Sequence, residues 1–256
     1  MGFDNKAIAT RIRSYETLGS TNTEALALAR SGEAGPVWVT AARQTAGRGR
    51  RGRAWVSEPG NLYASLLLTD LSNAERAPEL SFVASLALHD AIVALAPQLA
   101  PRLTLKWPND VLLDGAKLAG ILLEAERMPG HPLAVVIGIG VNCAHHPATA
   151  NYPATDLAAH GLTVTPELLL ARLTVAMAAW LAEWEKGFAT IRAAWLKHAM
   201  GLGSEIRVQL PERELTGRFE SLDPSGRLLL RLASGETELV LAGDVFGLAP
   251  ALGGAA

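Results

Sequence analysis

The sequence has a single cysteine, Cys143, and only five lysines among its 23 basic residues. One cysteine excludes a disulfide within the chain and is typical of a reducing compartment. No apolar run approaches the ~20 residues of a membrane-spanning helix. The N-terminal residues lack the apolar centre of a signal peptide, and Lys6 departs from the myristoylation pattern. These absences predict a cytoplasmic protein with no membrane partner.

The chain also has little net charge, −2 over 256 residues. A general nucleic-acid binder usually spreads basic residues over a whole face, so this balance argues against one. With 49% hydrophobic and 19% charged residues, the composition is that of a globular protein. The length fits one large domain, or one domain followed by a small one, and it allows a sizeable core.

Positive charge is concentrated in one segment, residues 44–55, which reads QTAGRGRRGRAW and contains no acidic residue. Its arginines and glycines are Arg48, Arg50, Arg51, Arg53, Gly47, Gly49 and Gly52. Like charges this close repel one another unless an anion lies among them, and glycines let backbone N–H groups approach such a ligand. The segment therefore favours a compact anion such as a phosphate. Taken alone, it fits a solvated basic loop or a nucleic-acid patch equally well.

The three glycines also match the pattern G-x-G-x-x-G of dinucleotide-binding loops. The residues that follow, 53–61, end in Pro-Gly-Asn and do not open a helix, so we reject this interpretation. Strands are predicted instead at residues 36–42 and 61–68. They lie on both sides of the segment 44–55, which we call the arginine loop. A long loop tethered at both ends is usually functional.

Three small polar residues, Ser20-Thr21-Asn22, stand before an Ala/Leu-rich helix ahead of this loop. Thr21 and Glu24 have the spacing of a capping box, so a helix cap alone would explain them. Small polar side chains at a helix start also form a hydrogen-bonding platform for a polar ligand head group. The segment alone leaves both interpretations open.

A second segment, residues 102–126, combines charged and turn-forming residues with short apolar runs, and it predicts three strands. Alternating apolar residues indicate the first at 103–107, and Pro108-Asn109-Asp110 ends it by turn chemistry. Residues 111–113 and 118–124 then read as a hairpin.

Two of the five lysines, Lys106 and Lys117, flank these predicted strands. A lysine at the mouth of an apolar strand needs a counter-charge, which either Asp110 or a ligand anion could supply. A turn alone needs Pro-Asn-Asp but neither lysine. The segment therefore indicates a binding site.

The next strand, residues 133–142, is an almost continuous apolar run and is expected to be buried on both faces. Gly138 and Gly140 leave space against its backbone, for a ligand group or equally for a neighbouring strand. Asn142 ends the run and could bond a ligand or close a turn. Cys143, His145 and His146 follow, but the sequence has no second Cys or His pair with the spacing of metal ligands. No protein metal cluster is therefore predicted.

The remaining chain changes character near residue 200. Helices are predicted at 79–95, 165–184 and 188–200, with their tryptophans in the core. After a glycine-bearing linker the pattern turns to four short alternating strands, near residues 206–210, 215–219, 228–232 and 239–241, which indicates a barrel of about fifty residues. We therefore expect a catalytic domain at 1–200 and a small barrel at 203–250.

Taken in order, five motifs resemble the biotin protein ligases, which attach biotin to acetyl-CoA carboxylase. They are Ser20-Thr21-Asn22, GRGRRGRAW after Gln44, KWPND, KLAGILLE and GIGVN. Each motif alone is a weak signal, but the five occur in order with compact spacing, and the resemblance covers nearly the whole chain. The resemblance implies an α+β fold of the class II synthetase or biotinyl-transferase type. This is a mixed sheet flanked by helices and followed by an SH3-like barrel, in agreement with the residue patterns.

One departure concerns the bifunctional members of this family, which carry an N-terminal helix-turn-helix domain that binds DNA. Here the first motif begins only twenty residues from the start. The resemblance therefore implies the enzyme without a DNA partner.

The family's reaction has two steps. Biotin and ATP give biotinyl-5′-AMP and pyrophosphate, and the acyl group then passes to one lysine of a biotin carboxyl carrier protein. ATP and Mg²⁺ are the implied cofactors and biotin is the substrate; Mg²⁺ would come with ATP, near Asp110. Attack of a carboxylate on a phosphate brings two anions together and needs positive charge at the new mixed anhydride.

The resemblance also assigns roles residue by residue. The implied catalytic residues are Lys117, Arg48 and Arg50, with Lys117 between the biotin carboxylate and the α-phosphate. The residues implied to bind biotin are Ser20, Thr21, Asn22, Gln44, Gly47, Arg48, Gly49, Arg50, Lys117 and Gly120. The residues implied to bind ATP are Arg50, Arg51, Arg53, Trp55, Lys106, Asn109, Asp110 and Asn142. Whether Asp110 serves Mg²⁺ or the acceptor lysine stays open.

Three alternatives compete with this interpretation. A lipoyl or octanoyl transferase shares the fold but usually lacks the arginine motif. A nucleic-acid-binding module would bind with a steep salt dependence and would leave KWPND and Lys117 unexplained. An inactive relative would only bind biotin, and intact Lys117, Arg48 and Arg50 argue against it. The oligomeric state is left open, with a homodimer through a sheet edge as one alternative.

Overall fold

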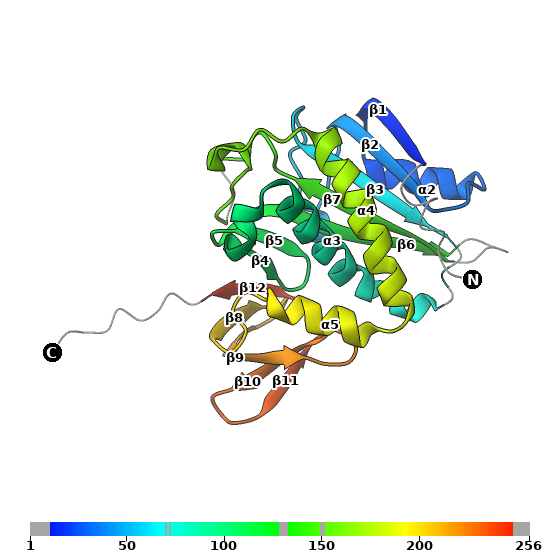
Figure 1. The fold of residues 1–256 in the computed structure, drawn as a ribbon. Coiled ribbons are helices and arrows are strands. Elements are labelled where there is room, and N and C mark those ends of the chain that lie inside the picture. The colour runs from blue at the N-terminus through cyan, green and yellow to red at the C-terminus, as the bar shows by residue number, and fades with distance from the viewer. Residues whose placement is uncertain (1–10, 70, 72, 128–132, 149–151, 248–256) are drawn as a thin grey trace.

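The structure is a computed structural model that describes residues 11–69, 71, 73–127, 133–148 and 152–247. A seven-stranded mixed sheet with helices on both faces is followed by a five-stranded antiparallel sheet (Figure 1). The predicted α+β class, with a mixed sheet first and a small all-β unit second, is confirmed.

The large sheet has the strand order β1-β2-β3-β7-β6-β5-β4. β1 and β2 run parallel, and the other neighbouring strands run antiparallel. The strands are β1 (Ile12–Leu18), β2 (Val37–Gln44), β3 (Leu62–Leu68), β4 (Leu103–Lys106), β5 (Asp110–Leu113), β6 (Ala116–Arg127) and β7 (Leu133–Val141). The hairpin predicted around Asp114-Gly115 is confirmed, with both residues in the left-handed φ region, at 50° and 77°.

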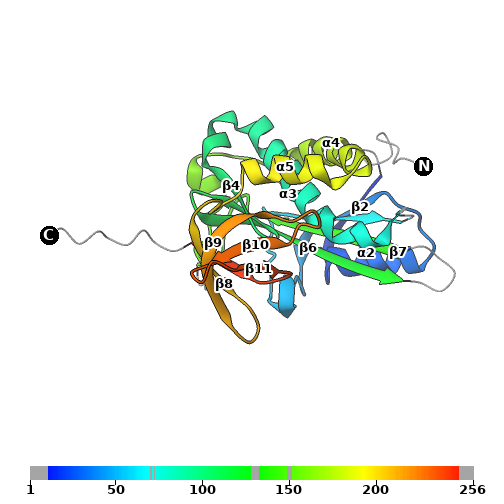
Figure 2. The same ribbon diagram turned by 90° about the horizontal axis from the view of Figure 1, so that it is seen from below.

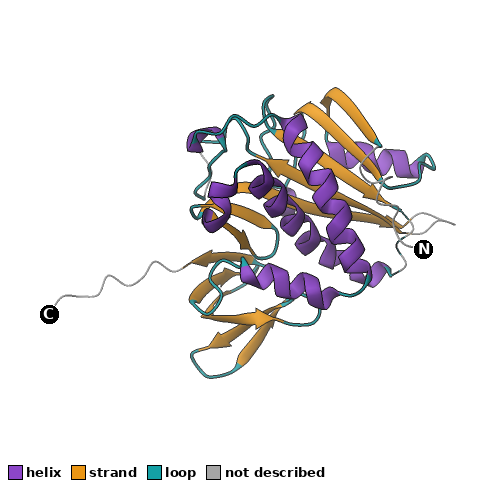
Figure 3. Ribbon diagram, in the orientation of Figure 1, coloured by secondary structure: helices purple, strands orange, loops and turns teal. Residues whose placement is uncertain are grey.

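Successive side chains of a strand point to opposite faces of the sheet. Both faces of this sheet are buried, each in its own core. Trp38 and Leu66 pack into the larger core, beneath a layer of α3 (Leu80–Leu95), α4 (Pro166–Glu185) and α5 (Phe188–Lys197) (Figure 3). Val39 and Leu67, one position further along, pack into a smaller core beneath α2 (Thr21–Arg30). Because α2 contacts β2, β3 and β7, it leaves the same face of β5 and β6 for other groups.

Short 3₁₀ turns connect several of these elements. They are η1 (Arg50–Gly52), η2 (Ala74–Glu79), η3 (Pro97–Arg102) and η4 (Ala158–His160). Asn73 caps η2 by accepting a hydrogen bond from the Glu75 amide, which fixes the entry into α3.

The small sheet has the order β11-β10-β9-β8-β12. Its strands are β8 (Glu205–Gln209), β9 (Glu214–Leu222), β10 (Leu228–Leu232), β11 (Thr237–Val240) and β12 (Asp244–Gly247). It lies against α5 (Figure 2). Trp107 Nε1 donates to the Gly226 carbonyl at 3.0 Å, and Arg192 Nη1 donates to the Leu222 carbonyl at 2.8 Å. The first bond joins the small sheet to the turn after β4, the second joins it to α5, and apolar residues of both sheets belong to one core.

Two predicted details differ from the structure. The sequence pattern predicted four strands in the barrel and missed β12, which pairs with β8. The predicted helix 188–200 ends at Lys197, because the chain then turns to bond β4. The Leu105 amide donates to the His198 carbonyl, and the Met200 amide donates to the Leu105 carbonyl, both at 2.8 Å.

One helical stretch, Ala74–Leu95, is long and apolar enough to cross a membrane by length and composition alone. Within the structure 67% of its most apolar window is buried, and α3 packs against α4, α5 and the sheet. Its place at the centre of the core explains its apolarity.

Candidate active site

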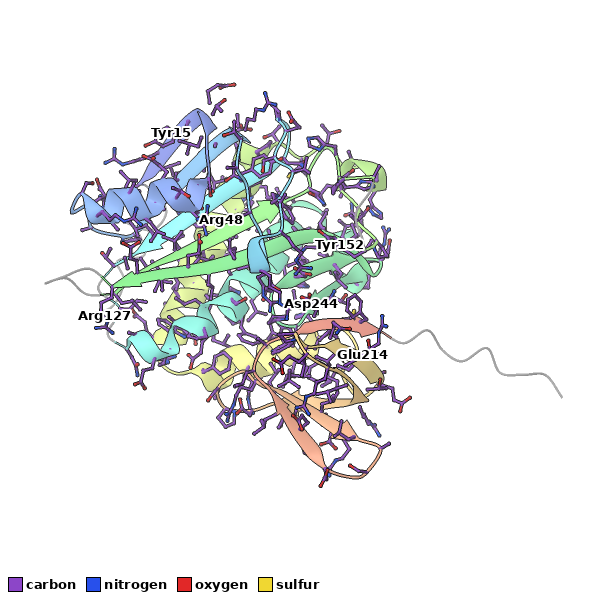
Figure 4. The ribbon with its side chains drawn as sticks, turned by 180° about the vertical axis from the view of Figure 1, so that it is seen from behind. Tyr15, Arg48, Arg127, Tyr152, Glu214 and Asp244 are labelled. Carbon is purple, nitrogen blue, oxygen red and sulfur yellow. The ribbon has the colours of Figure 1, made fainter. Side chains whose placement is uncertain are left out.

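A cavity of about 70 Å³ lies on the α2 face of the large sheet, over β6 and β7. The arginine loop covers it, and Arg48 and Tyr152 lie at this face in Figure 4. The predicted residues that line it are Ser20, Thr21, Asn22, Gln44, Arg48, Gly49, Arg50, Arg53, Trp55, Asn109, Asp110, Lys117 and Gly120. Segments up to 100 residues apart in sequence therefore meet at one place, as the motifs predicted.

One end of the cavity is a network of neutral polar groups. The Thr21 amide and hydroxyl both approach Gln44 Oε1, at 2.8 and 3.1 Å. Ser65 Oγ lies 2.7 Å from Thr21 Oγ1 and 2.6 Å from Asn22 Oδ1. All of these groups except Gln44 are buried, so their hydrogen bonds hold them in fixed positions.

The capping-box interpretation of Thr21 and Glu24 is wrong. Ser20 precedes the first helical residue, and its side chain makes no cap hydrogen bond. The Thr21 hydroxyl turns to Gln44 instead, and Glu24 accepts a hydrogen bond from the Tyr15 hydroxyl at 3.0 Å. The polar start of α2 is therefore part of the cavity wall.

Glycines on the sheet leave the space that the cavity uses. A Cβ on Gly138 would overlap the Asn22 amide, at 2.9 Å from its Cγ. A Cβ on Gly140 would lie 2.6 Å from the Trp55 ring, and one on Gly120 would lie 3.2 Å from Lys117 and Trp55. The two glycines of β7 thus accommodate side chains from α2 and the arginine loop, which is neither of the two alternatives left open by the sequence.

The arginine loop closes on itself like a short hairpin. The Trp55 amide donates to the Gly47 carbonyl at 2.9 Å, and the Gly49 amide donates to the Arg53 carbonyl at 2.7 Å. Arg48 pairs with Glu124 of β6 at 2.9 Å, and Glu124 also accepts from Asn22 Nδ2 at 2.7 Å. The loop has no acid of its own, but the folded chain brings acids to it.

The second cationic group, Lys117, opens β6. Its Nζ lies 2.8 Å from Asp110 Oδ1, and the rings of Trp55 and Tyr152 lie 5.3 and 5.1 Å away. The Lys117 amide donates to the Pro153 carbonyl, and the Lys117 carbonyl accepts from the Thr155 amide. These two bonds place the neighbouring Tyr152 over the amine. The amine is therefore enclosed by one carboxylate and two aromatic faces.

Arg50 lies on the other side of Asp110. Its Nη1 donates to Asn109 Oδ1 at 3.1 Å, and burial lowers the pKa of its guanidinium. Burial also lowers the pKa of Lys106, whose Nζ lies 3.9 Å from Asp110. Several cations thus surround one carboxylate, so this end of the cavity attracts an anion.

Four predicted residues do not line the cavity. Asn142 is buried and donates from Nδ2 to the Thr155 carbonyl at 3.0 Å, where it supports the loop under Tyr152. Lys106 and Arg51 lie outside the wall, and a Cβ on Gly47 would lie 2.6 Å from the Ser57 hydroxyl, at the loop base. Their roles in ligand binding stay predictions.

Within the described residues no three His, Cys, Asp or Glu side chains group as metal ligands. The two histidines after Cys143 have other partners. His146 Nδ1 lies 2.6 Å from Asp156, and His145 Nδ1 lies 3.3 Å from the Asn61 amide.

The sequence interpretation missed Tyr152, which lines the cavity, and also Ser65 and Glu124, which bond to residues that line it. Glu124 carried a signal, because it places a charge at the end of an apolar strand. Ser65 interrupts an otherwise apolar strand that is buried along its whole length. Tyr152 sits in an irregular loop, where nothing in the sequence indicated its direction.

The arrangement joins a hydrogen-bonding neutral end to a cationic end within one cavity. The neutral end suits a polar head group, and the cationic end suits carboxylate and phosphate groups. A ligand reaching from one end to the other would place its anionic part beside Lys117 and Arg50.

Two regions of the chain match known protein families. Residues 15–142 match the Biotin/lipoate A/B protein ligase family, and residues 201–247 match the Biotin protein ligase C terminal domain. A biotin–[acetyl-CoA-carboxylase] ligase of Paracoccus denitrificans is 46% identical over 89% of this chain and 96% of its own length. A protein of the same name from Mycobacterium tuberculosis is 35% identical over 89% of this chain and 85% of its own.

Solved structures give the same result. The biotin protein ligase of Aquifex aeolicus in complex with biotin and ATP superimposes with a TM-score of 0.78. It is 26% identical over 93% of this chain and 98% of its own length. The Leishmania major enzyme in complex with biotinyl-5-AMP has a TM-score of 0.66 and 26% identity over 91% of this chain and 99% of its own. With its matched regions on both sheets and its cavity at their motifs, this chain belongs to the Biotin/lipoate A/B protein ligase family.

Proposed function

We infer that the protein is a biotin–[acetyl-CoA-carboxylase] ligase, which uses ATP to activate biotin and then transfers it to a carrier protein. The observation that carries this function is the convergence of Lys117, Arg48 and Arg50 on one cavity whose other end is neutral and polar. Biotin has a neutral ureido head group and an anionic carboxylate, so its two ends match the two ends of the cavity.

The head group would meet the hydrogen-bonding network. Ser20, Thr21, Asn22 and Gln44 offer donors and acceptors there, and the buried hydroxyl of Ser65 orients two of them. Gly120 and the β6 wall would lie along the rings and the aliphatic chain. These groups are already positioned by hydrogen bonds to one another, which lowers the entropic cost of binding.

The first step joins two anions. An oxygen of the biotin carboxylate attacks the α-phosphorus of ATP, a P–O bond to the β-phosphate breaks, and pyrophosphate leaves. In the proposed arrangement Lys117 Nζ lies between the carboxylate and the α-phosphate, with Arg48 and Arg50 over the adenylate. Fixed cations at this place stabilise the negative charge of the transition state.

The nucleotide would lie on the cationic side of the cavity. Trp55, Asn109 and Asp110 line the cavity next to the cations, while Arg53 and Arg51 extend from it along the arginine loop. We assign Arg51 and Arg53 to the pyrophosphate end. Lys106 and Asn142 support the site from behind, through Asp110 and the loop that carries Tyr152.

The enzyme uses ATP with Mg²⁺, and the metal supplies charge neutralisation at the phosphates. Asp110 does not fit as its ligand, because Lys117 lies 2.8 Å from one of its oxygens and Lys106 lies 3.9 Å from the other. Among the described side chains no acidic cluster could replace it. Mg²⁺ therefore enters with the ATP phosphates, and Asp110 holds the position of Lys117.

In the second step the neutral amine of a lysine on the biotin carboxyl carrier protein attacks the acyl carbon. The amide bond forms, AMP leaves with its phosphate oxygen, and the nitrogen loses a proton. We place the protein in the cytoplasm, where its cysteine would remain reduced. We do not assign a DNA partner, and a homodimer remains one alternative for its assembly.

The test uses purified protein with ATP, Mg²⁺, labelled biotin and a biotin carboxyl carrier domain. Mass spectrometry should find label on one carrier lysine, and none on a carrier whose acceptor lysine is replaced. Biotin-dependent exchange of labelled pyrophosphate into ATP tests the first step alone. Transfer of lipoate in preference to biotin, or no exchange with biotin, would overturn the proposal.

A further inference from the structure

The side chains at the tip of the arginine loop, residues 50–53, pair with Asp244, the first residue of β12 in the small sheet. Its carboxylate lies 3.6 Å from Arg50 Nη1, 3.4 Å from Arg51 Nη1 and 3.3 Å from Arg53 Nη2. The neighbouring Gly243 carbonyl accepts a further hydrogen bond from Arg50 at 3.2 Å. Figure 4 shows Asp244 at the junction of the two sheets.

The tip needs such a partner for two reasons. Three guanidinium groups lie within a few residues and repel one another. Arg51 also adopts a left-handed conformation, with φ of 56°, which strains the backbone of a non-glycine residue. A single carboxylate that faces all three arginines offsets both the charge repulsion and the backbone strain.

The carboxylate itself has a fixed position. Asp244 pairs with Gln209 in the β12–β8 ladder, and its side chain is only 20% exposed. The small sheet is in turn bonded to Trp107, which follows β4 of the large sheet, and to Arg192 of α5. Asp244 is therefore a rigid anchor for the loop, and its own sheet lies outside the cavity.

Asp244 does not neutralise the loop. Three guanidinium groups share one carboxylate, and each distance is longer than the 2.7–2.9 Å of a tight charge-assisted hydrogen bond. Positive charge remains in excess at the tip. The tip is thus held in place and still attracts an anion.

We propose that Asp244 is a positioning residue, through which the C-terminal sheet holds the tip of the arginine loop in place before nucleotide binds. This inference rests on the proposed function, in which the same arginines receive the phosphates of ATP. A loop held near its bound position spends less binding energy on ordering, so ATP binds more tightly. Asp244 does not line the cavity and acts only through Arg50, Arg51 and Arg53.

The first test needs no activity. In Asp244→Asn the negative charge is lost while the size is kept, and limited trypsin digestion without ligands should cut after Arg50, Arg51 or Arg53 roughly fivefold faster or more. Glu214→Gln is the matched control, because it removes one charge from the same sheet, where Glu214 pairs with Arg207. Cleavage in the rest of the chain should be equal in both variants.

The second test separates positioning from stability. In biotin-dependent pyrophosphate exchange, Asp244→Asn should raise the KM for ATP about tenfold while the KM for biotin stays within about twofold. Asp244→Glu should recover part of the loss. Glu214→Gln should behave like the wild type.

Two results would overturn the proposal. Equal loop cleavage in Asp244→Asn and wild type would show that the anchor does not hold the tip. A lower KM for ATP in Asp244→Asn would show that the carboxylate only competes with the phosphates. If the wild type shows no exchange at all, the proposed function fails, and the ligand-free digestion still decides the role of Asp244 in holding the loop.

Discussion

Asn22 fills the space that a side chain at position 138 would need. The Gly138 backbone lies against the Asn22 amide, and a Cβ there would stand 2.9 Å from Asn22 Cγ and closer still to Oδ1. Asn22 in turn receives a hydrogen bond from Ser65 and donates one to Glu124. One glycine on β7 therefore sets the position of a polar group that we assign to the biotin head.

Gly138→Ala should accordingly weaken biotin binding. The added methyl displaces the Asn22 amide from its network, so we expect the KM for biotin to rise roughly tenfold or more, with some loss of stability. Gly247→Ala is the control, because no atom lies within 4 Å of a Cβ there. Pyrophosphate exchange at varied biotin gives the KM. An unchanged value in Gly138→Ala would contradict the assignment of Asn22.

Lys117→Ala should abolish adenylate formation without unfolding the protein. The amine is the cation closest to Asp110 at the reacting end of the cavity, and its loss removes stabilisation of the transition state. We expect biotin-dependent pyrophosphate exchange to fall by at least about 100-fold.

Binding and a surface control complete this experiment. Lys186→Ala removes an exposed lysine that pairs with Glu183 at 2.6 Å, and its exchange rate should equal that of the wild type. Calorimetric titration should still detect biotin binding to Lys117→Ala, because the head-group network is intact. Wild-type exchange by Lys117→Ala would refute the role of the amine.

Local patterns predicted much of this molecule. The strand-loop-strand around the arginines, the β5–β6 hairpin and the long helices follow from periodicity and turn residues, which act over a few positions. The cavity-lining motifs were also found, because each carries its unusual residues within a short segment. Lys117, for example, opens a buried strand, where a charge already signals a partner.

Contacts between distant segments were not predictable. Glu124 meets Arg48 across 76 residues and Asp244 meets Arg53 across 191, and no local pattern records such a pairing. The sequence therefore suggested that only a ligand could relieve the repulsion among the arginines. The structure corrects this premise, since acids from β6 and β12 already contact the loop.

Cys143 should be unreactive in the folded protein. Its thiol is 1% exposed, and burial raises its pKa to about 11. At about pH 8 a thiol with this pKa has a thiolate fraction roughly 200-fold lower than a free cysteine of pKa about 8.5. Reaction with a thiol reagent should be slower than in unfolded protein by at least that factor. Labelling at the same rate before and after addition of urea would contradict the buried position.

A pair of histidines outside the active site predicts a loss of stability in mild acid. The rings of His89 and His198 lie 4.1 Å apart, with Asp90 bonded to His89 and Lys197 next along the chain. Burial lowers the pKa of His198, and the charge of His89 lowers it further. The unfolded chain then binds a proton more readily than the folded one, so stability is complete above the ordinary histidine value and falls as pH drops below about 6.5.

His198→Gln should reduce this acid loss, because glutamine cannot take up the proton. We would compare urea unfolding midpoints at about pH 7.5 and about pH 5.5, a window in which few carboxylates titrate. The wild type and His146→Gln, whose ring faces the Asp156 carboxylate instead, should both keep the drop in midpoint. If His198→Gln shows the same drop as the wild type, the acid sensitivity arises elsewhere. The pKa of His198 would then be the same in the folded and unfolded states, since only a proton that binds both states equally leaves the unfolding free energy unchanged.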